Sequence, residues 1–183
     1  MDNYKHNAFV IRTPVKETIA MLVISGVLEI GAIYIAVFLP DYRIASIVFA
    51  VLFTPLILFL ASGMILFQVQ INAICLSVRT MTGKRFSFTC GEIYKIVCER
   101  RGSIKYGASY YDIEIYTDEN VTNTNMVIVS HGREGFSRLA EYLLTQLNTG
   151  EISETAASDS CRKELRRYAK GEIFGRKKRD REA

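Results

Sequence analysis

Two long runs of apolar residues dominate the N-terminal part of the chain. The first covers residues 18–39, 22 positions with Glu29 as the single charged residue, and the second covers residues 44–67, 24 positions without a charge. Because a helix rises about 1.5 Å per residue, each run can cross the roughly 30 Å hydrocarbon core of a bilayer. The first run is too long for a signal peptide, and its end lacks the small residues of a cleavage site. Only residues 40–43 separate the runs, so the pattern predicts a two-helix transmembrane hairpin over residues 18–67.

Positive charge is distributed unequally around the predicted hairpin. Lys5, Arg12 and Lys16 precede the first run, Arg43 alone lies between the runs, and many basic residues follow the second. Lys and Arg accumulate on the cytoplasmic side of membrane proteins. The sequence therefore predicts a cell-membrane protein with two spans, in which the N-terminal segment (residues 1–17) and the C-terminal part both face the cytoplasm.

Glu29 lies near the middle of the first predicted span, where a charged side chain costs roughly 2.5 kcal/mol or more. Folding the hairpin about its loop places Glu29 opposite Thr54 and Pro55, with Ser25 one turn earlier on the same face. Pro55 cannot donate to the carbonyl of Val51, so the second helix is locally open there. We expect a protonated Glu29 that hydrogen-bonds to Thr54 or to this carbonyl. A contact between oligomer subunits and proton or ion transport are the alternatives, although no internal repeat indicates a transporter.

Beyond residue 70 the apolar positions change to a period of two, which is typical of half-buried strands. Short polar or glycine-containing turns separate the alternating segments. The predicted strands cover residues 74–79, 86–89, 93–100, 110–117 and 126–130.

An amphipathic helix is predicted after the last strand. Its apolar positions fall on one stripe, at a spacing of three or four residues, and the chain after it ends the helix at residues 148–150. The stripe consists of Phe136, Leu139, Ala140, Leu143 and Leu147. Residues 70–148 are therefore expected to form a soluble α+β domain of antiparallel strands and one C-terminal helix.

Two segments of this domain, SVRTMTGKRFSFTCGEIYKIV near its start and VIVSHGREGFSRLAEYLLTQL at its end, resemble bacterial pleckstrin-homology-like domains. In those families a strand, a turn, a strand and an F-x-x-x-x-I segment (here residues 88–93) open a small antiparallel barrel, and a C-terminal helix closes one end. Uncharacterised bacterial membrane protein families place such a domain directly after a two-helix transmembrane hairpin, and residues 18–148 are similar to them. The resemblance implies binding of lipids, peptides or proteins and no enzyme activity.

The resemblance also implies seven strands, two more than the alternating pattern predicts. Residues 8–11 have the sequence Ala-Phe-Val-Ile and precede the first apolar run. They could return from the N-terminus and add an edge strand, or the barrel could be truncated.

The C-terminal region divides into two parts by composition. Residues 149–160 are rich in Ser, Thr, Ala and acids and are expected to form a flexible linker. Residues 161–183 contain ten Lys or Arg against four Asp or Glu, a balance of +6 that leaves −2 for the rest of a chain whose total is +4. Residues 161–174 could form a short helix.

A basic tail tethered to a bilayer is suited to binding anionic lipid headgroups, because each basic residue near the surface contributes roughly 1 kcal/mol. A simple solvated tail is the alternative. Nucleic acid is not expected as a partner, since no aromatic stacking platform accompanies the charges. The candidate lipid contacts are Arg162, Lys163, Arg166, Arg167, Lys170, Arg176, Lys177, Lys178 and Arg179.

Signatures of catalysis, metal binding and cofactor binding are absent from the sequence. There is no phosphate-binding loop, no GxSxG elbow and no HExxH motif, and the only histidines are His6 and His131. The four cysteines lack metal-ligand spacing and are expected to be reduced, small apolar residues. They are Cys75, Cys90, Cys98 and Cys161.

Two functions of different classes are compatible with this sequence. The first is a non-enzymatic, membrane-anchored interaction module whose pleckstrin-homology-like domain and tail bind a protein partner or the anionic membrane surface. The second is a small subunit of a membrane transport or envelope assembly that acts through the hairpin and Glu29. The second function would also depend on the small-residue faces of the two spans. A homo-oligomer is compatible with either function. We expect the first function.

Overall fold

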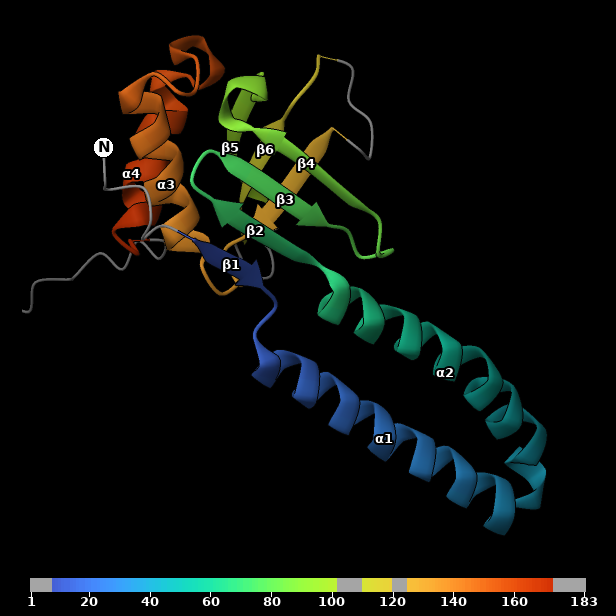
Figure 1. Ribbon diagram of the computed structural model, residues 1–183. Coiled ribbons are helices and arrows are strands. Elements are labelled where there is room, and N and C mark those ends of the chain that lie inside the picture. Colours follow the sequence, from blue (N-terminus) through green and yellow to red (C-terminus); the bar gives the residue numbers. More distant parts are fainter. Residues whose placement is uncertain (1–7, 102–109, 120–124, 173–183) are drawn as a thin grey trace, which may run out of the picture. The chain divides into compact units, whose positions relative to one another are not determined.

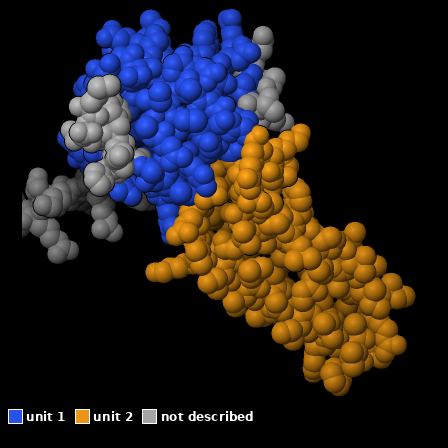
Figure 2. All heavy atoms as spheres, viewed as in Figure 1, with its two compact units in different colours: residues 1–11, 69–78, 86–183 blue, residues 12–68, 79–85 orange. Residues whose placement is uncertain are grey.

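The computed structural model describes residues 8–101, 110–119 and 125–172 (Figure 1). The chain divides into two compact units, which Figure 2 distinguishes by colour. One, here called the sheet unit, contains residues 1–11, 69–78 and 86–183, and the other, the hairpin unit, contains residues 12–68 and 79–85.

Two long apolar helices form most of the hairpin unit. Helix α1 covers Val15–Phe38 and helix α2 covers Arg43–Leu66, joined by the short 3-10 helix η2 (Pro40–Tyr42). Their most apolar windows have mean hydropathies of 2.2 and 2.7, and only 11% of each window is buried within the protein. Exposure of so much apolar surface is unfavourable in water but not in the hydrocarbon core of a bilayer. Both helices are long and apolar enough to cross a membrane.

Small residues and one cation determine how the two helices meet. Ala32 in α1 and Ser46 and Ala61 in α2 are buried, which lets the helix backbones approach closely. At the turn, Arg43 Nε donates to the carbonyl of Ala36 at 2.9 Å. This contact satisfies one of the carbonyls that the end of α1 leaves without a helical partner and places a positive charge at the negative end of the helix dipole.

The described part of the sheet unit contains seven strands in two sheets. The four-stranded sheet has the order β1-β2-β3-β4, and the three-stranded sheet has the order β5-β6-β7 with antiparallel pairing throughout. The strands are β1 (Phe9–Arg12), β2 (Gln68–Asn72), β3 (Cys75–Arg79), β4 (Arg85–Thr89), β5 (Lys95–Arg101), β6 (Tyr110–Tyr116) and β7 (Met126–Ser130).

The hairpin is an insertion between two neighbouring strands of one sheet. Strand β1 leads into α1 through Thr13 and Pro14, and α2 leads into β2 through Phe67 alone. Strand β1 is the edge strand that the sequence offered as an alternative. Strand β2 was missed, because its buried Val69 and Ile71 follow the apolar run of α2 directly and look like its end.

Helix α3 (Phe136–Thr149) forms as the apolar stripe predicts, and all five residues of that stripe are buried. Gly135 precedes it with φ of +87°, a conformation that L side chains rarely adopt. A Cβ on Gly135 would lie 3.2 Å from the carbonyl oxygen of Val10 and 3.3 Å from Ile11. The start of α3 therefore packs directly on β1, so the N-terminal strand is an integral part of the sheet unit.

The turn between β2 and β3 is held by a residue of α3. Ala73 at this turn has φ of +50°, and its carbonyl accepts a hydrogen bond from the Tyr142 hydroxyl at 2.7 Å. The same hydroxyl lies 3.0 Å from Cys90 Sγ. Burial raises the pKa of Tyr142, so this hydroxyl stays protonated and available as a donor.

Residues after α3 differ from the expected flexible linker, whereas the short helix offered for residues 161–174 is present in part as helix α4 (Asp159–Ala169). Ile152, Ala156 and Ala157 are buried, and Ala157 forms a parallel bridge with Ile96 of β5. The 3-10 helix η5 (Glu154–Ala156) and helix α4 follow, so two C-terminal helices cover the sheet unit instead of one. The buried positions are few and widely spaced among polar residues, which is why composition alone indicates a linker.

Candidate functional site

The polar contact inside the hairpin joins the two helices through their side chains. Thr54 Oγ1 in α2 lies 2.5 Å from Glu29 Oε1 in α1 and also 2.7 Å from the carbonyl oxygen of Ala50. A hydroxyl has one proton, so the Glu29 carboxyl oxygen and the Ala50 carbonyl oxygen share it in a three-centre contact. Ser25, the third residue expected here, donates instead to the Met21 carbonyl of its own helix at 2.7 Å.

An apolar groove lies between the two helices nearer their connecting turn. It has a volume of about 660 Å³, and small side chains form part of its wall. The residues that line it include Val27, Gly31, Ala32, Ala45, Ser46 and Phe49. Its lining offers apolar packing surface and no titratable side chain other than the phenol of Tyr42.

Helix α4 is amphipathic and carries the basic residues that the sequence singled out. Its N-terminus is capped by Ser158, whose hydroxyl accepts from the Cys161 N–H at 3.2 Å. Cys161, Leu165 and Tyr168 are buried on the face that packs against α3 and β5. The helix is therefore held by tertiary contacts, which a segment of this length needs in order to be stable.

The exposed side of α4 presents a row of three cations. Lys163, Arg166 and Lys170 are spaced by three and four residues, so they project from the same side of the helix, and all three are exposed. We call them the basic face.

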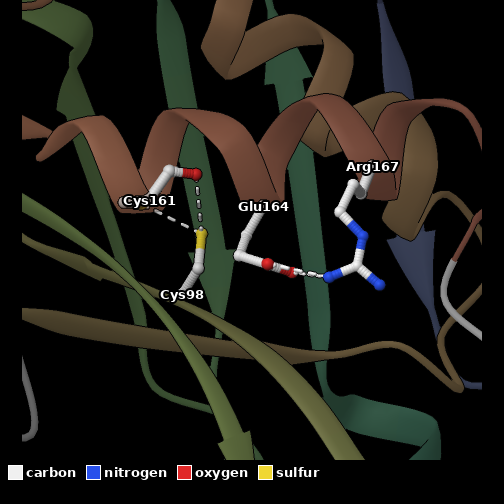
Figure 3. Close-up of polar contacts among 4 residues, drawn as sticks. All are labelled: Cys98, Cys161, Glu164 and Arg167. Carbon is white, nitrogen blue, oxygen red and sulfur yellow. Dashed lines mark hydrogen bonds and ion pairs between the residues drawn. The ribbon is translucent and has the colours of Figure 1, made fainter. Parts of the chain in front are cut away.

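Two other basic residues of α4 are used within the sheet unit. Arg162 donates from Nη2 to the Glu154 carbonyl at 2.8 Å and from Nε to the Ala157 carbonyl at 3.3 Å. Arg167 donates from Nη1 to both carboxylate oxygens of Glu164, at 2.8 and 2.9 Å (Figure 3). Glu164 thus neutralises Arg167 beside the basic face, and Arg162 holds η5 against α4. The remaining expected contacts, Arg176, Lys177, Lys178 and Arg179, lie outside the described residues.

His131 has a structural role at the start of the last turn before α3. Its Nδ1 accepts from the backbone N–H of Tyr111 at 3.2 Å, and its own backbone N–H donates to the Tyr111 carbonyl at 2.8 Å. These contacts extend the pairing of β6 with β7 by one residue. Across residues 8–101, 110–119 and 125–172, no group of three His, Cys, Asp or Glu side chains is arranged to hold a metal ion.

Comparison with known proteins gives no family assignment: no protein-family model, curated protein or solved structure matches this chain. The resemblance to pleckstrin-homology-like domains therefore depends on the sequence segments quoted above and on the order of the elements.

Proposed function

We propose that this protein is a membrane-anchored, non-enzymatic binding module. The hairpin anchors the sheet unit at the cytoplasmic face of the cell membrane, and the basic face of α4 binds anionic lipid headgroups. The observation that carries this proposal is the exposed row of Lys163, Arg166 and Lys170 on a helix whose opposite side is buried.

Binding by the basic face needs little ordering of the protein. The backbone of α4 is already fixed by packing, so association costs mainly the side-chain freedom of three residues. At roughly 1 kcal/mol for each basic residue near an anionic surface, the three residues contribute about 3 kcal/mol. Such a contribution is weak for a free domain. It is sufficient for a domain that the two spans keep at the bilayer, because tethering raises the effective concentration of the surface.

We also propose that the sheet unit is a pleckstrin-homology-like domain. Two antiparallel sheets of four and three strands, followed by a helix, support this proposal, because the resemblance implies seven strands and a C-terminal helix. Domains of this kind bind lipids, peptides or proteins and carry no catalytic machinery. A protein partner on the sheet unit is therefore compatible with lipid binding by α4.

The contacts of Glu29 favour an anchoring hairpin over a subunit of a transport assembly. Its carboxyl is hydrogen-bonded to Thr54 within the same hairpin, so the pair acts as a contact between α1 and α2. A residue that serves transport or assembly would instead have to contact the groups of a proton path or a second protein.

The test uses the full chain, reconstituted in nanodiscs of neutral lipid or of neutral lipid mixed with an anionic phospholipid. Acylation of lysine amines by an N-hydroxysuccinimide ester is followed by mass spectrometry at low and at high salt. We expect slower acylation of Lys163 and Lys170 in anionic nanodiscs at low salt and recovery at high salt, since salt screens the attraction. Lys95, an exposed lysine of β5, serves as the internal control. Equal rates in neutral and anionic nanodiscs would contradict lipid binding.

A further inference from the structure

Two cysteine side chains from distant parts of the sequence meet between β5 and α4. Cys98 lies on β5 and Cys161 in the first turn of α4, 63 residues apart in the chain. Their sulfur atoms are 3.0 Å apart, and Cys98 Sγ also lies 3.7 Å from the carbonyl oxygen of Cys161 (Figure 3). Both are free thiols. Little movement is needed to bring these sulfur atoms to the roughly 2.05 Å of a disulfide bond.

The surroundings of the pair make Cys161 the more nucleophilic thiol. The positive end of the α4 dipole stabilises a thiolate at this position. A hydrogen bond from Cys98 lowers the pKa of Cys161, and the positive charge of Arg162 acts in the same direction, whereas burial and Glu164 oppose them. The same contact with Cys161 and burial raise the pKa of Cys98, so Cys98 is the thiol of the pair that keeps its proton.

Access to the pair is through Cys98. This side chain is half-buried, whereas Cys161 is 5% exposed. A small oxidant such as hydrogen peroxide would therefore approach the pair from the side of Cys98. The pair thus combines a stabilised thiolate, a second thiol in contact with it and limited access, which together characterise cysteines that oxidise reversibly.

We propose that Cys98 and Cys161 are a redox modification site that closes to an intramolecular disulfide on reaction with a peroxide. The Cys161 thiolate attacks one peroxide oxygen, the O–O bond breaks, and Cys161 becomes a sulfenic acid as the first water leaves. Cys98 then loses its proton and attacks the Cys161 sulfur, so that the S–S bond forms, the S–O bond breaks and a second water leaves. The two thiols lose two electrons and two protons, and hydrogen peroxide is reduced to two molecules of water.

Closure of the disulfide would join α4 covalently to β5 and hold the basic face on the sheet unit. In the cytoplasmic location proposed above, thiols are kept reduced, so the bond would form only transiently under oxidation. The chemistry of the pair does not depend on lipid binding. Failure of the lysine acylation test would leave this proposal unaffected.

The experiment uses the full chain in detergent micelles, reduced and then freed of reductant. Hydrogen peroxide is added, remaining thiols are trapped with a maleimide, and the protein is digested for mass spectrometry. We expect two of the four thiols to be lost, one linked peptide pair that contains Cys98 and Cys161, and full recovery with dithiothreitol. C90S should form the same link, because Cys90 contacts Tyr142 elsewhere in the sheet unit.

Two variants distinguish disulfide formation between Cys98 and Cys161 from unspecific oxidation of the cysteines. In C98S, the sulfenic acid on Cys161 has no resolving thiol and should be trapped by dimedone. In C161S, Cys98 should react many-fold more slowly than the wild-type pair. Oxidation of either cysteine without a link between them in the wild-type chain would overturn the proposal. Links that involve Cys75 or Cys90 as the main product would overturn it as well.

Discussion

Replacing Leu165 with alanine tests whether α4 belongs to the folded sheet unit. Leu165 is fully buried on the inner face of α4, between the other buried residues Cys161 and Tyr168. Removing a buried leucine side chain costs about 2–5 kcal/mol. Because α4 has only 11 residues, it is unstable without this packing, and the cost should appear as local unfolding of the helix.

The assay is amide hydrogen exchange of the full chain in detergent micelles. A factor of ten in an equilibrium corresponds to about 1.4 kcal/mol, so Leu165→Ala should accelerate exchange in α4 by about 30-fold or more. The exchange of α1 and α2 should not change. Arg166→Ala is the matched control, since it shortens the neighbouring, exposed side chain of the same helix. Fast and equal exchange of α4 in the wild type and in Leu165→Ala would show a flexible tail and refute the packed helix.

Three further predictions concern other parts of the molecule. Gly135→Ala should destabilise the sheet unit by about 1–3 kcal/mol in thermal unfolding, because of its positive φ and the nearby Val10 carbonyl, whereas Gly132→Ala has open space and should have little effect. Thr54→Val should reduce the free energy of unfolding of the hairpin in detergent by roughly 0.6–1.7 kcal/mol. Glu29→Gln keeps a neutral hydrogen-bonding group and should reduce it less. Equal losses in the two variants would contradict a neutral contact. The thiolate is the reactive form of cysteine, so the lowered pKa of Cys161 and the raised pKa of Cys90 should place the rise in reaction with a small reagent, methyl methanethiosulfonate, at lower pH for Cys161. The reverse order would contradict these shifts.

Periodicity alone is sufficient to predict most elements of this protein. The boundaries of the two apolar runs lie within three residues of the boundaries of α1 and α2. The boundaries of the alternating segments lie within two residues of those of β3 to β7. Folding the chain about the short turn also places Glu29 opposite Thr54, and these two side chains are hydrogen-bonded. These successes have a common reason, since each depends on interactions that repeat along one element or across one tight turn.

The features that the sequence did not reveal depend on contacts between distant segments. The sequence offered strand β1 only as an alternative, because the strand is fixed by its neighbour β2 and by the close approach of Gly135, neither of which has a local signal. The segment that contains Ile152 and Ala157 resembles a linker in composition, yet its few apolar residues fill the space beside β5. Cys98 and Cys161 are too far apart in the chain for any spacing rule to pair them.

Only the structure shows which basic residues of the C-terminal region are exposed and which bind within the sheet unit. All nine candidates carry the same charge, and only the packing of α4 separates Arg162 and Arg167, which bind within the sheet unit, from the exposed basic face. Charge counting predicts that the C-terminal region is basic, but it cannot predict which charges remain available to a partner.

Binding of anionic lipid by the basic face of α4 can be measured as the ratio of the Lys163 acylation rate in neutral nanodiscs to that in anionic nanodiscs. The ratio would be measured for the wild-type chain and for the double variant R166E/K170E, which reverses the two neighbouring charges and keeps the buried side of α4 intact. At roughly 1 kcal/mol per basic residue, removal of two attractive charges should weaken surface binding by about 30-fold, and reversal should weaken it further. Lipid binding by the basic face predicts a ratio above one in the wild type that falls to one in R166E/K170E. A ratio of one in the wild type, or an equal ratio in both proteins, would contradict it.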